Sequence, residues 1–201
     1  MKINIYHALI LGLASASSHA ADVNQTITPL TNASNVMARC AAIAKNTYSI
    51  PAPAGQIDVF AAEHQNEVMT KEHAAAAANR SPAAKPKEMR AENLKSMTPE
   101  QKVFTEKMRS QRQELRKCGE DYLKTNAEAA LLAKKVSAEL GSSKAQPNDD
   151  DKKIGVALIA YMTAGETLSA EISTLSKSQV HQLYMGRTVR KYFLGHDVIA
   201  N

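Results

Sequence analysis

Apolar residues recur at intervals of three and four along most of the chain, which is the periodicity of amphipathic helices. The clearest run lies between positions 98 and 140, where an apolar or aromatic residue returns every seven positions: Met108, Leu115, Tyr122, Ala129 and Val136. This repeat predicts a long helix with a seam against neighbouring helices, and it leaves open a break at Gly119. Shorter runs predict further helices over about 31–48, 58–79, 149–175 and 176–194.

Prolines and capping residues mark the ends of the first two predicted helices. Pro29 places 21–30 in a polar leader that precedes the first helix. The run PAPAG at 51–55 ends that helix. Asp58 can then act as the N-cap of the second helix.

The fold class follows from these runs. No segment alternates polar and apolar residues as a strand does, and Leu, Ile, Val and Phe form only about 18% of the chain after residue 20. Alanine is abundant and favours helix, so thin apolar seams around a small core are expected. We predict an all-α, four- to five-helix bundle closed by one disulfide, as a single domain over 21–201. An Ala/Pro-rich stretch near 74–86 is a predicted flexible hinge, and 141–148 a linker.

The first twenty residues resemble a secretory signal. Lys2 precedes an apolar stretch from about Tyr6 to Leu13, and Ser18 and Ala20 stand at −3 and −1 of a cleavage site. The stretch is too short for a membrane-spanning helix. We therefore predict an exported protein, and the short signal with one lysine favours the bacterial periplasm.

Two cysteines, Cys40 and Cys118, form an even count in a chain predicted to be exported. A disulfide between them is the expected pairing. In the chain-entropy model, a bridge that closes so long a loop stabilises the fold by about 4 kcal/mol. For a core this thin, that contribution is decisive.

Recognisable catalytic chemistry is missing from the sequence. No nucleophile elbow, zinc-protease, Walker or Rossmann glycine pattern occurs, so we predict no enzyme, no cofactor and no metal site. Metal binding stays an alternative because Met69 and His73 are four apart, but no third ligand joins them, and His64 falls on the opposite helix face.

Charge is unevenly distributed. The chain has 25 Lys and Arg against 20 Asp and Glu, and the segment 85–117 alone holds ten basic against five acidic residues. A solvated helix face explains such a run, as does a surface for clients or for anionic lipid. Export and the lack of interleaved aromatics argue against nucleic acid. A second basic cluster near the C-terminus is more amphipathic: Arg187, Arg190, Lys191, Tyr192 and Phe193.

Two segments share the pattern apolar, hydroxyl, any, any, Gln, which is the signature of a capped helix start. They are Met97, Thr98 and Gln101, with Pro99 at the first helical position, and Leu175, Ser176 and Gln179. In the second segment, Ser176 or Ser178 would cap the last helix. Both segments resemble the paired L-T-x-x-Q motifs of the Spy/CpxP family of periplasmic proteins.

The resemblance implies a helical dimer with ATP-independent chaperone activity and a basic, partly apolar client surface. By this resemblance, four residues are expected to contact clients or anions: Met108, Arg109, Arg112 and Arg116. We therefore expect a non-enzymatic exported binding protein whose partners are unfolded clients. The alternatives are a dedicated partner protein, such as an immunity protein or an enzyme inhibitor, and a metal-binding periplasmic protein. Peripheral contact with an anionic membrane surface stays open.

Overall fold

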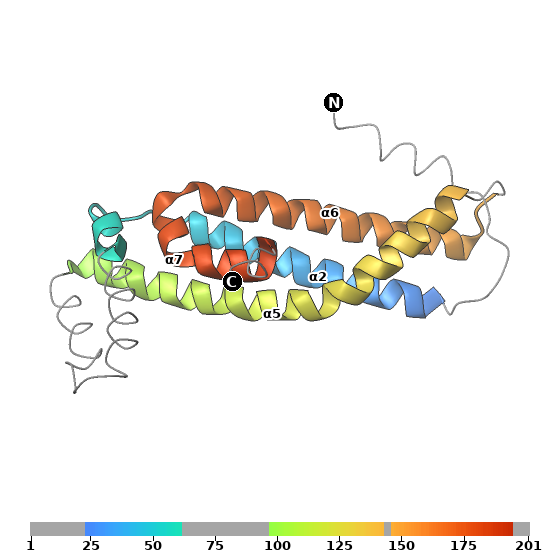
Figure 1. The fold of residues 1–201 in the computed structure, drawn as a ribbon, viewed down its shortest axis with the longest axis horizontal. Helices are drawn as coiled ribbons and strands as arrows, with labels where there is room; N and C mark the ends of the chain where they lie inside the picture. The colour runs from blue at the N-terminus through green and yellow to red at the C-terminus, as the bar shows by residue number, and fades with distance from the viewer. Residues whose placement is uncertain (1–22, 62–96, 143–145, 195–201) are drawn as a thin grey trace, which may run out of the picture. The chain divides into compact units, whose positions relative to one another are not determined.

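The computed structural model describes residues 23–61, 97–142 and 146–194, and all of its regular elements are helical (Figure 1). In chain order these are α2 (Val23–Tyr48), α5 (Pro99–Ser142), α6 (Asp149–Lys177), α7 (Gln179–Val189) and a π-helical turn η1 (Arg190–Leu194), with a short helical segment at 56–61. No strand occurs within these ranges, so the all-α prediction is confirmed for them. The predicted signal peptide and the hinge near 74–86 lie outside the described residues.

The chain divides into two compact units. One, which we call the bridged unit, comprises Met1–Ala42 and Lys117–Ala170. The other, which we call the basic unit, comprises Ile43–Arg116 and Glu171–Asn201. Each of the three long helices contributes residues to both units.

The disulfide predicted between Cys40 and Cys118 is present in the bridged unit, with the two Cα atoms 5.6 Å apart. Both side chains are buried, on α2 and α5 respectively. Because the bridge closes a sequence separation of 78 residues, it fixes the points at which the chain leaves and re-enters this unit.

The first helix begins earlier than its sequence suggests. Pro29 lies inside α2, which starts at Val23, so the prediction of a leader over 21–30 is wrong from Val23 onward. A proline in a helix interior removes one backbone hydrogen bond. Burial of Thr26 and Leu30, on one face of this part of the helix, offsets that loss.

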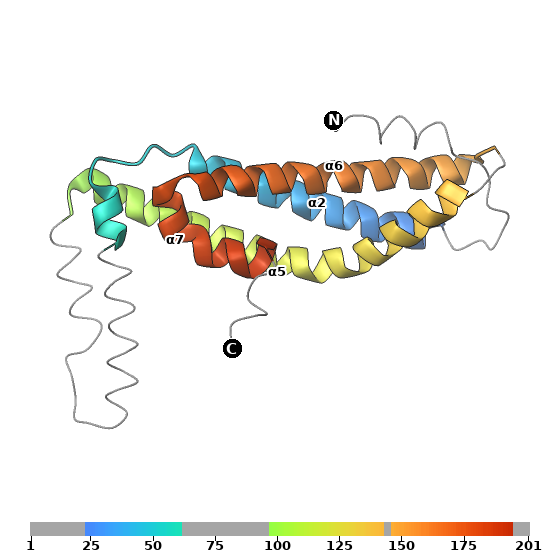
Figure 2. The same ribbon diagram turned by 45° about the horizontal axis from the view of Figure 1, so that its top comes forward.

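Further contacts within the bridged unit tie α6 to α2 and α5. Ser34 Oγ donates a hydrogen bond of 3.2 Å to the carbonyl oxygen of Ala160. Tyr161 Oη donates to Asn126 Oδ1 at 2.7 Å. The Met37 sulfur would lie 3.6 Å from a Cβ at Gly165, which is ordinary van der Waals contact and shows that α2 and α6 pack together there. Within this unit, α2 and α6 run side by side in both ribbon views (Figures 1 and 2).

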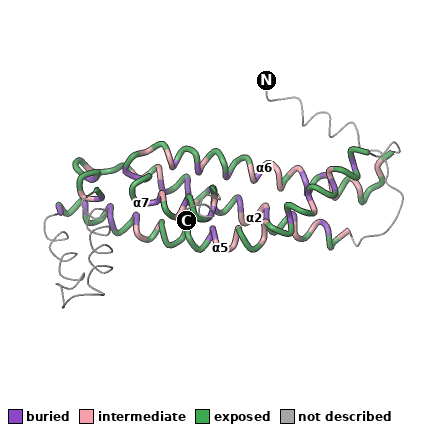
Figure 3. The backbone as a smooth tube through the Cα atoms, in the orientation of Figure 1, coloured by how far each residue is buried: buried purple, intermediate pink, exposed green. Residues whose placement is uncertain are grey.

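Helix α5 is continuous through Gly119 and spans 44 residues. Its predicted seam is confirmed: Met108, Leu115, Ala129 and Val136 are buried, and Tyr122 is half-buried. Figure 3 shows the same pattern as buried positions that recur along the described helices between exposed ones. In these described ranges, no helix combines the length and the apolar character that crossing a membrane requires.

Candidate binding surface

The start of α5 anchors the basic unit through a reciprocal capping box. The Thr98 amide donates to Gln101 Oε1 at 3.0 Å, and the Gln101 amide donates to Thr98 Oγ1 at 3.2 Å. Gln101 Nε2 also donates to the Ala54 carbonyl oxygen at 3.0 Å. The same glutamine therefore caps α5 and holds the turn at Gly55, whose φ of +72° favours glycine.

The short helix after this turn starts at Gln56, so the prediction that Asp58 is its N-cap is wrong. The turn at Gly55 starts the helix two residues earlier, and this leaves Asp58 inside the first turn and exposed. The shift buries Gln56, whose Nε2 donates to Thr105 Oγ1 at 3.1 Å. The predicted continuation of this helix to about residue 79 lies outside the described residues.

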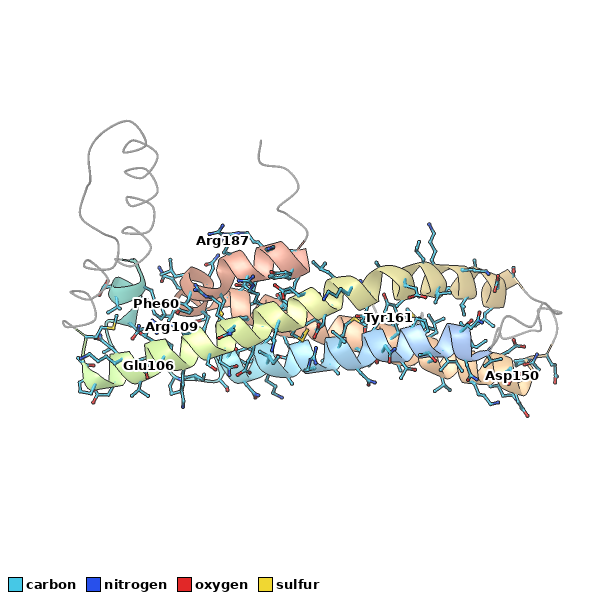
Figure 4. The ribbon with its side chains drawn as sticks, turned by 90° about the horizontal axis from the view of Figure 1, so that it is seen from below. Phe60, Glu106, Arg109, Asp150, Tyr161 and Arg187 are labelled. Carbon is cyan, nitrogen blue, oxygen red and sulfur yellow. A yellow bond between two sulfur atoms is a disulfide. The ribbon has the colours of Figure 1, made fainter. Side chains whose placement is uncertain are left out.

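A row of aromatic rings runs outward from the core of the basic unit. The Phe60 and Phe104 ring centroids are 6.0 Å apart, and those of Phe60 and Tyr184 are 4.6 Å apart. The Arg112 guanidinium carbon lies 4.7 Å from the Tyr184 centroid, which is a cation–π contact. Tyr184, the outermost ring of the row, thus positions the exposed cation of Arg112. Phe60, in the middle of the row, is labelled in Figure 4.

His181 lies at the inner end of this row. Its ring meets Phe104 edge-on with the centroids 6.3 Å apart, and its Nδ1 is 2.6 Å from Ser178 Oγ. Burial lowers the pKa of His181, and a contact with the Thr47 backbone opposes this shift to a smaller extent. The imidazole is therefore neutral at pH 7 and belongs to the apolar core.

The four predicted client contacts fall in different environments. Met108 is fully buried, so the prediction that it touches a client is wrong in this fold: its side chain fills the α5 seam. Arg109 is half-buried, and its Nε is a buried atom without a hydrogen-bond partner. Arg112 and Arg116 are exposed on α5.

The second apolar-hydroxyl-Gln motif is not a capping box. Ser176 lies in the last turn of α6, and its Oγ donates to the Ile172 carbonyl oxygen at 2.9 Å. An N-cap needs extended backbone, which occurs two residues later at Ser178, where ψ is 117°. The predicted cap at Ser176 is therefore wrong. Leu175 is buried and Gln179 is the first residue of α7, and Ser178 makes no side-chain capping bond because its Oγ contacts His181.

The two units differ in formal net charge. The described residues of the basic unit hold ten Lys and Arg against five Asp and Glu, whereas those of the bridged unit hold seven against eight. Exposed aliphatic side chains accompany the positive charge on the basic unit: Ile57, Val103, Leu183 and Leu194. The chemistry available there is capture of a partner by charge and by apolar contact.

Two residues of this surface could not be identified from the sequence pattern. Tyr184 and Phe60 carry the cation–π row, but they come from segments more than 120 residues apart, and no local spacing relates them. Among the described residues, no group of three His, Cys, Asp or Glu side chains is placed to hold a metal ion.

No family model matches the chain, and no curated protein or solved structure is detectably similar to it. The resemblance to the Spy/CpxP family stays a prediction.

Proposed function

We propose that this is an exported, non-enzymatic binding protein that holds protein clients on the basic unit, in the manner of an ATP-independent periplasmic chaperone. One observation supports it: the basic unit combines a twofold excess of cations with exposed aliphatic side chains. The disulfide adds support for an oxidising, exported environment.

The two kinds of side chain act at different stages of binding. Cations attract an acidic or partly acidic chain over roughly a Debye length of 8–10 Å and raise the rate of encounter. Aliphatic groups then bury apolar surface of the client, and each Å² removed from water contributes about 25 cal/mol. Val103 is 59% exposed on α5, four residues from the exposed Lys107 and therefore on the same side of that helix. Such a surface needs no fixed sequence in its client.

The test is suppression of aggregation of a denatured client by the purified, oxidised protein at low and high salt. We expect dose-dependent suppression that weakens as salt screens the cations. The variant Lys107→Gln/Arg112→Gln/Arg116→Gln removes three exposed charges from the basic unit and should suppress poorly.

The matched control is Lys124→Gln/Lys134→Gln/Lys135→Gln, which removes three exposed charges from the bridged unit on the same helix. It should retain the activity of the parent. Equal loss in both variants, or no suppression at stoichiometric excess, contradicts the proposal. Capture of one native protein without any suppression would instead favour a dedicated partner protein, such as an inhibitor or an immunity protein.

A further inference from the structure

The C-terminal helical segment of the basic unit is free of acidic residues. The sequence holds no Asp or Glu between Glu171 and Asp197. Within this stretch, α7 and η1 together carry three cations: Arg187, Arg190 and Lys191. An ordinary solvated helix mixes both signs of charge, as α5 does.

The three cations share one exposed face with two leucines. Leu183, Arg187, Arg190, Lys191 and Leu194 are all exposed, and they follow one another at spacings of four, three, one and three residues. At 3.6 residues per turn, Leu183, Arg187 and Arg190 fall within an arc of about 60°, and Lys191 and Leu194 follow in the π-helical turn η1. We call this set the α7 cationic face. The opposite side of α7 is buried in the basic unit through His181, Met185 and Val189.

Local contacts hold the cations of this face against the helix. Arg190 Nη1 would lie 3.8 Å from a Cβ at Gly186, so the arginine side chain folds back against the preceding turn of α7. Lys191 Nζ lies 4.9 Å from the centroid of the Tyr192 ring, which is buried in the core. The π-helical turn that carries both residues is a rare conformation that occurs often at functional sites. Figure 4 shows Arg187 on the outer side of α7.

The helix dipole accounts for part of this arrangement. Cations in the last turn of a helix are stabilised by its C-terminal partial charge. That effect acts only within one turn, so it explains neither the lack of acids before α7 nor the exposure of Leu183 and Leu194, at 37% and 46%. Three cations with a leucine at either end match a partner that offers negative charge at its surface and an apolar layer beneath that surface.

We infer that the α7 cationic face docks the protein on an anionic lipid surface. A bilayer leaflet supplies many negative headgroups in a plane, which a row of side chains on one helix can meet without a groove. Below the headgroups, the acyl boundary accepts leucines. An acidic protein segment matches the face less well, because Leu183 and Leu194 would need a pocket in that partner. The inference goes beyond the proposed function, since lipid docking requires no client.

Each cation near an anionic surface adds about fivefold to the partition coefficient. The test is sedimentation of the purified protein with vesicles of phosphatidylglycerol and phosphatidylcholine (3:7) and with vesicles of phosphatidylcholine alone. We expect binding to the first only, lost as salt increases. The variant Arg187→Gln/Arg190→Gln/Lys191→Gln should lower the partition coefficient by about a hundredfold. Because all three side chains are exposed, this variant should keep the helical circular dichroism of the parent.

The control is again Lys124→Gln/Lys134→Gln/Lys135→Gln, which has the same net charge but an intact α7 cationic face. It should bind anionic vesicles nearly as well as the parent. Equal weakening of both variants means that net charge alone drives binding and overturns the inference. Equal binding to both kinds of vesicle overturns it as well, as does binding to poly-glutamate without binding to anionic vesicles.

Discussion

Reduction of the Cys40–Cys118 bridge should remove a large part of the stability of the bridged unit. The bridge spans 78 residues of sequence, and the chain-entropy relation for a loop of that length gives about 4–5 kcal/mol at 25 °C. Domains of this size are stable by only about 5–15 kcal/mol. Both cysteines are buried, and few large apolar residues are available to replace the contribution of the bridge.

The measurement is equilibrium unfolding in urea, followed by circular dichroism, with and without reductant. With a denaturant dependence of about 2 kcal/mol/M, the loss corresponds to a midpoint about 2 M lower. Reduction leaves the buried sulfur atoms in place, so little cavity cost is added. The variant Cys40→Ala/Cys118→Ala is the control for reductant itself, because its midpoint should not respond to the reagent. Coincident curves for the oxidised and reduced parent would refute the reasoning.

Three further predictions test the caps, the core and the buried histidine. Thr98→Ala should destabilise the protein by about 1 kcal/mol in urea titrations, because the Gln101 amide loses its capping acceptor; an unchanged midpoint would contradict the role of the box. Met108→Ala should cost about 2–5 kcal/mol and lower the melting temperature, as expected for a seam residue and not for a surface contact. Burial lowers the pKa of His181 from its ordinary 6.5, so the folded state binds fewer protons than the unfolded state, and stability should fall as pH drops below about 6.5. His181→Gln should flatten that slope in urea midpoints measured between pH 5 and 7.5, and an unaltered slope would exclude this histidine as its source.

The long helix and its seam could be predicted because local signals agree there. Thr98 and Gln101 lie three apart in a capping box, and the seven-residue apolar repeat continues from that point. Cys40 and Cys118 were also predictable, because two cysteines allow a single intramolecular pairing. In these places the tertiary structure agrees with local preference.

Predictions failed where tertiary packing outweighed local preference. The start of α2 is helical despite Pro29 because Thr26, Leu30 and Ala33, on one face of this part of the helix, are buried within the bridged unit. The segment at Leu175 matches the residue pattern of a capping box, but burial of Leu175 keeps Ser176 within α6. The two segments differ at the position after the hydroxyl residue: Pro99, which favours a helix start, follows Thr98, whereas Lys177 follows Ser176.

The candidate surface was only partly visible in the sequence. The basic run identified Arg112 and Arg116, but the same run included Met108, which the seven-residue repeat assigned equally well to the core. The contact that positions Arg112 comes from Tyr184, which is 72 residues away on α7. Contacts between residues so far apart in the sequence depend on the packing of the basic unit, so residue spacing does not predict them.

The central claim, that clients bind to the basic unit, is tested most directly by site-specific photo-crosslinking on α5. A photoreactive residue replaces either Val103, which is 59% exposed in the basic unit, or Leu131, which is 73% exposed in the bridged unit. Both are exposed aliphatic positions on one helix, so exposure alone favours Leu131. We predict that a denatured client crosslinks at position 103 and not at position 131, and that salt weakens the product. Equal crosslinking at the two positions, or crosslinking at position 131 alone, would contradict the account.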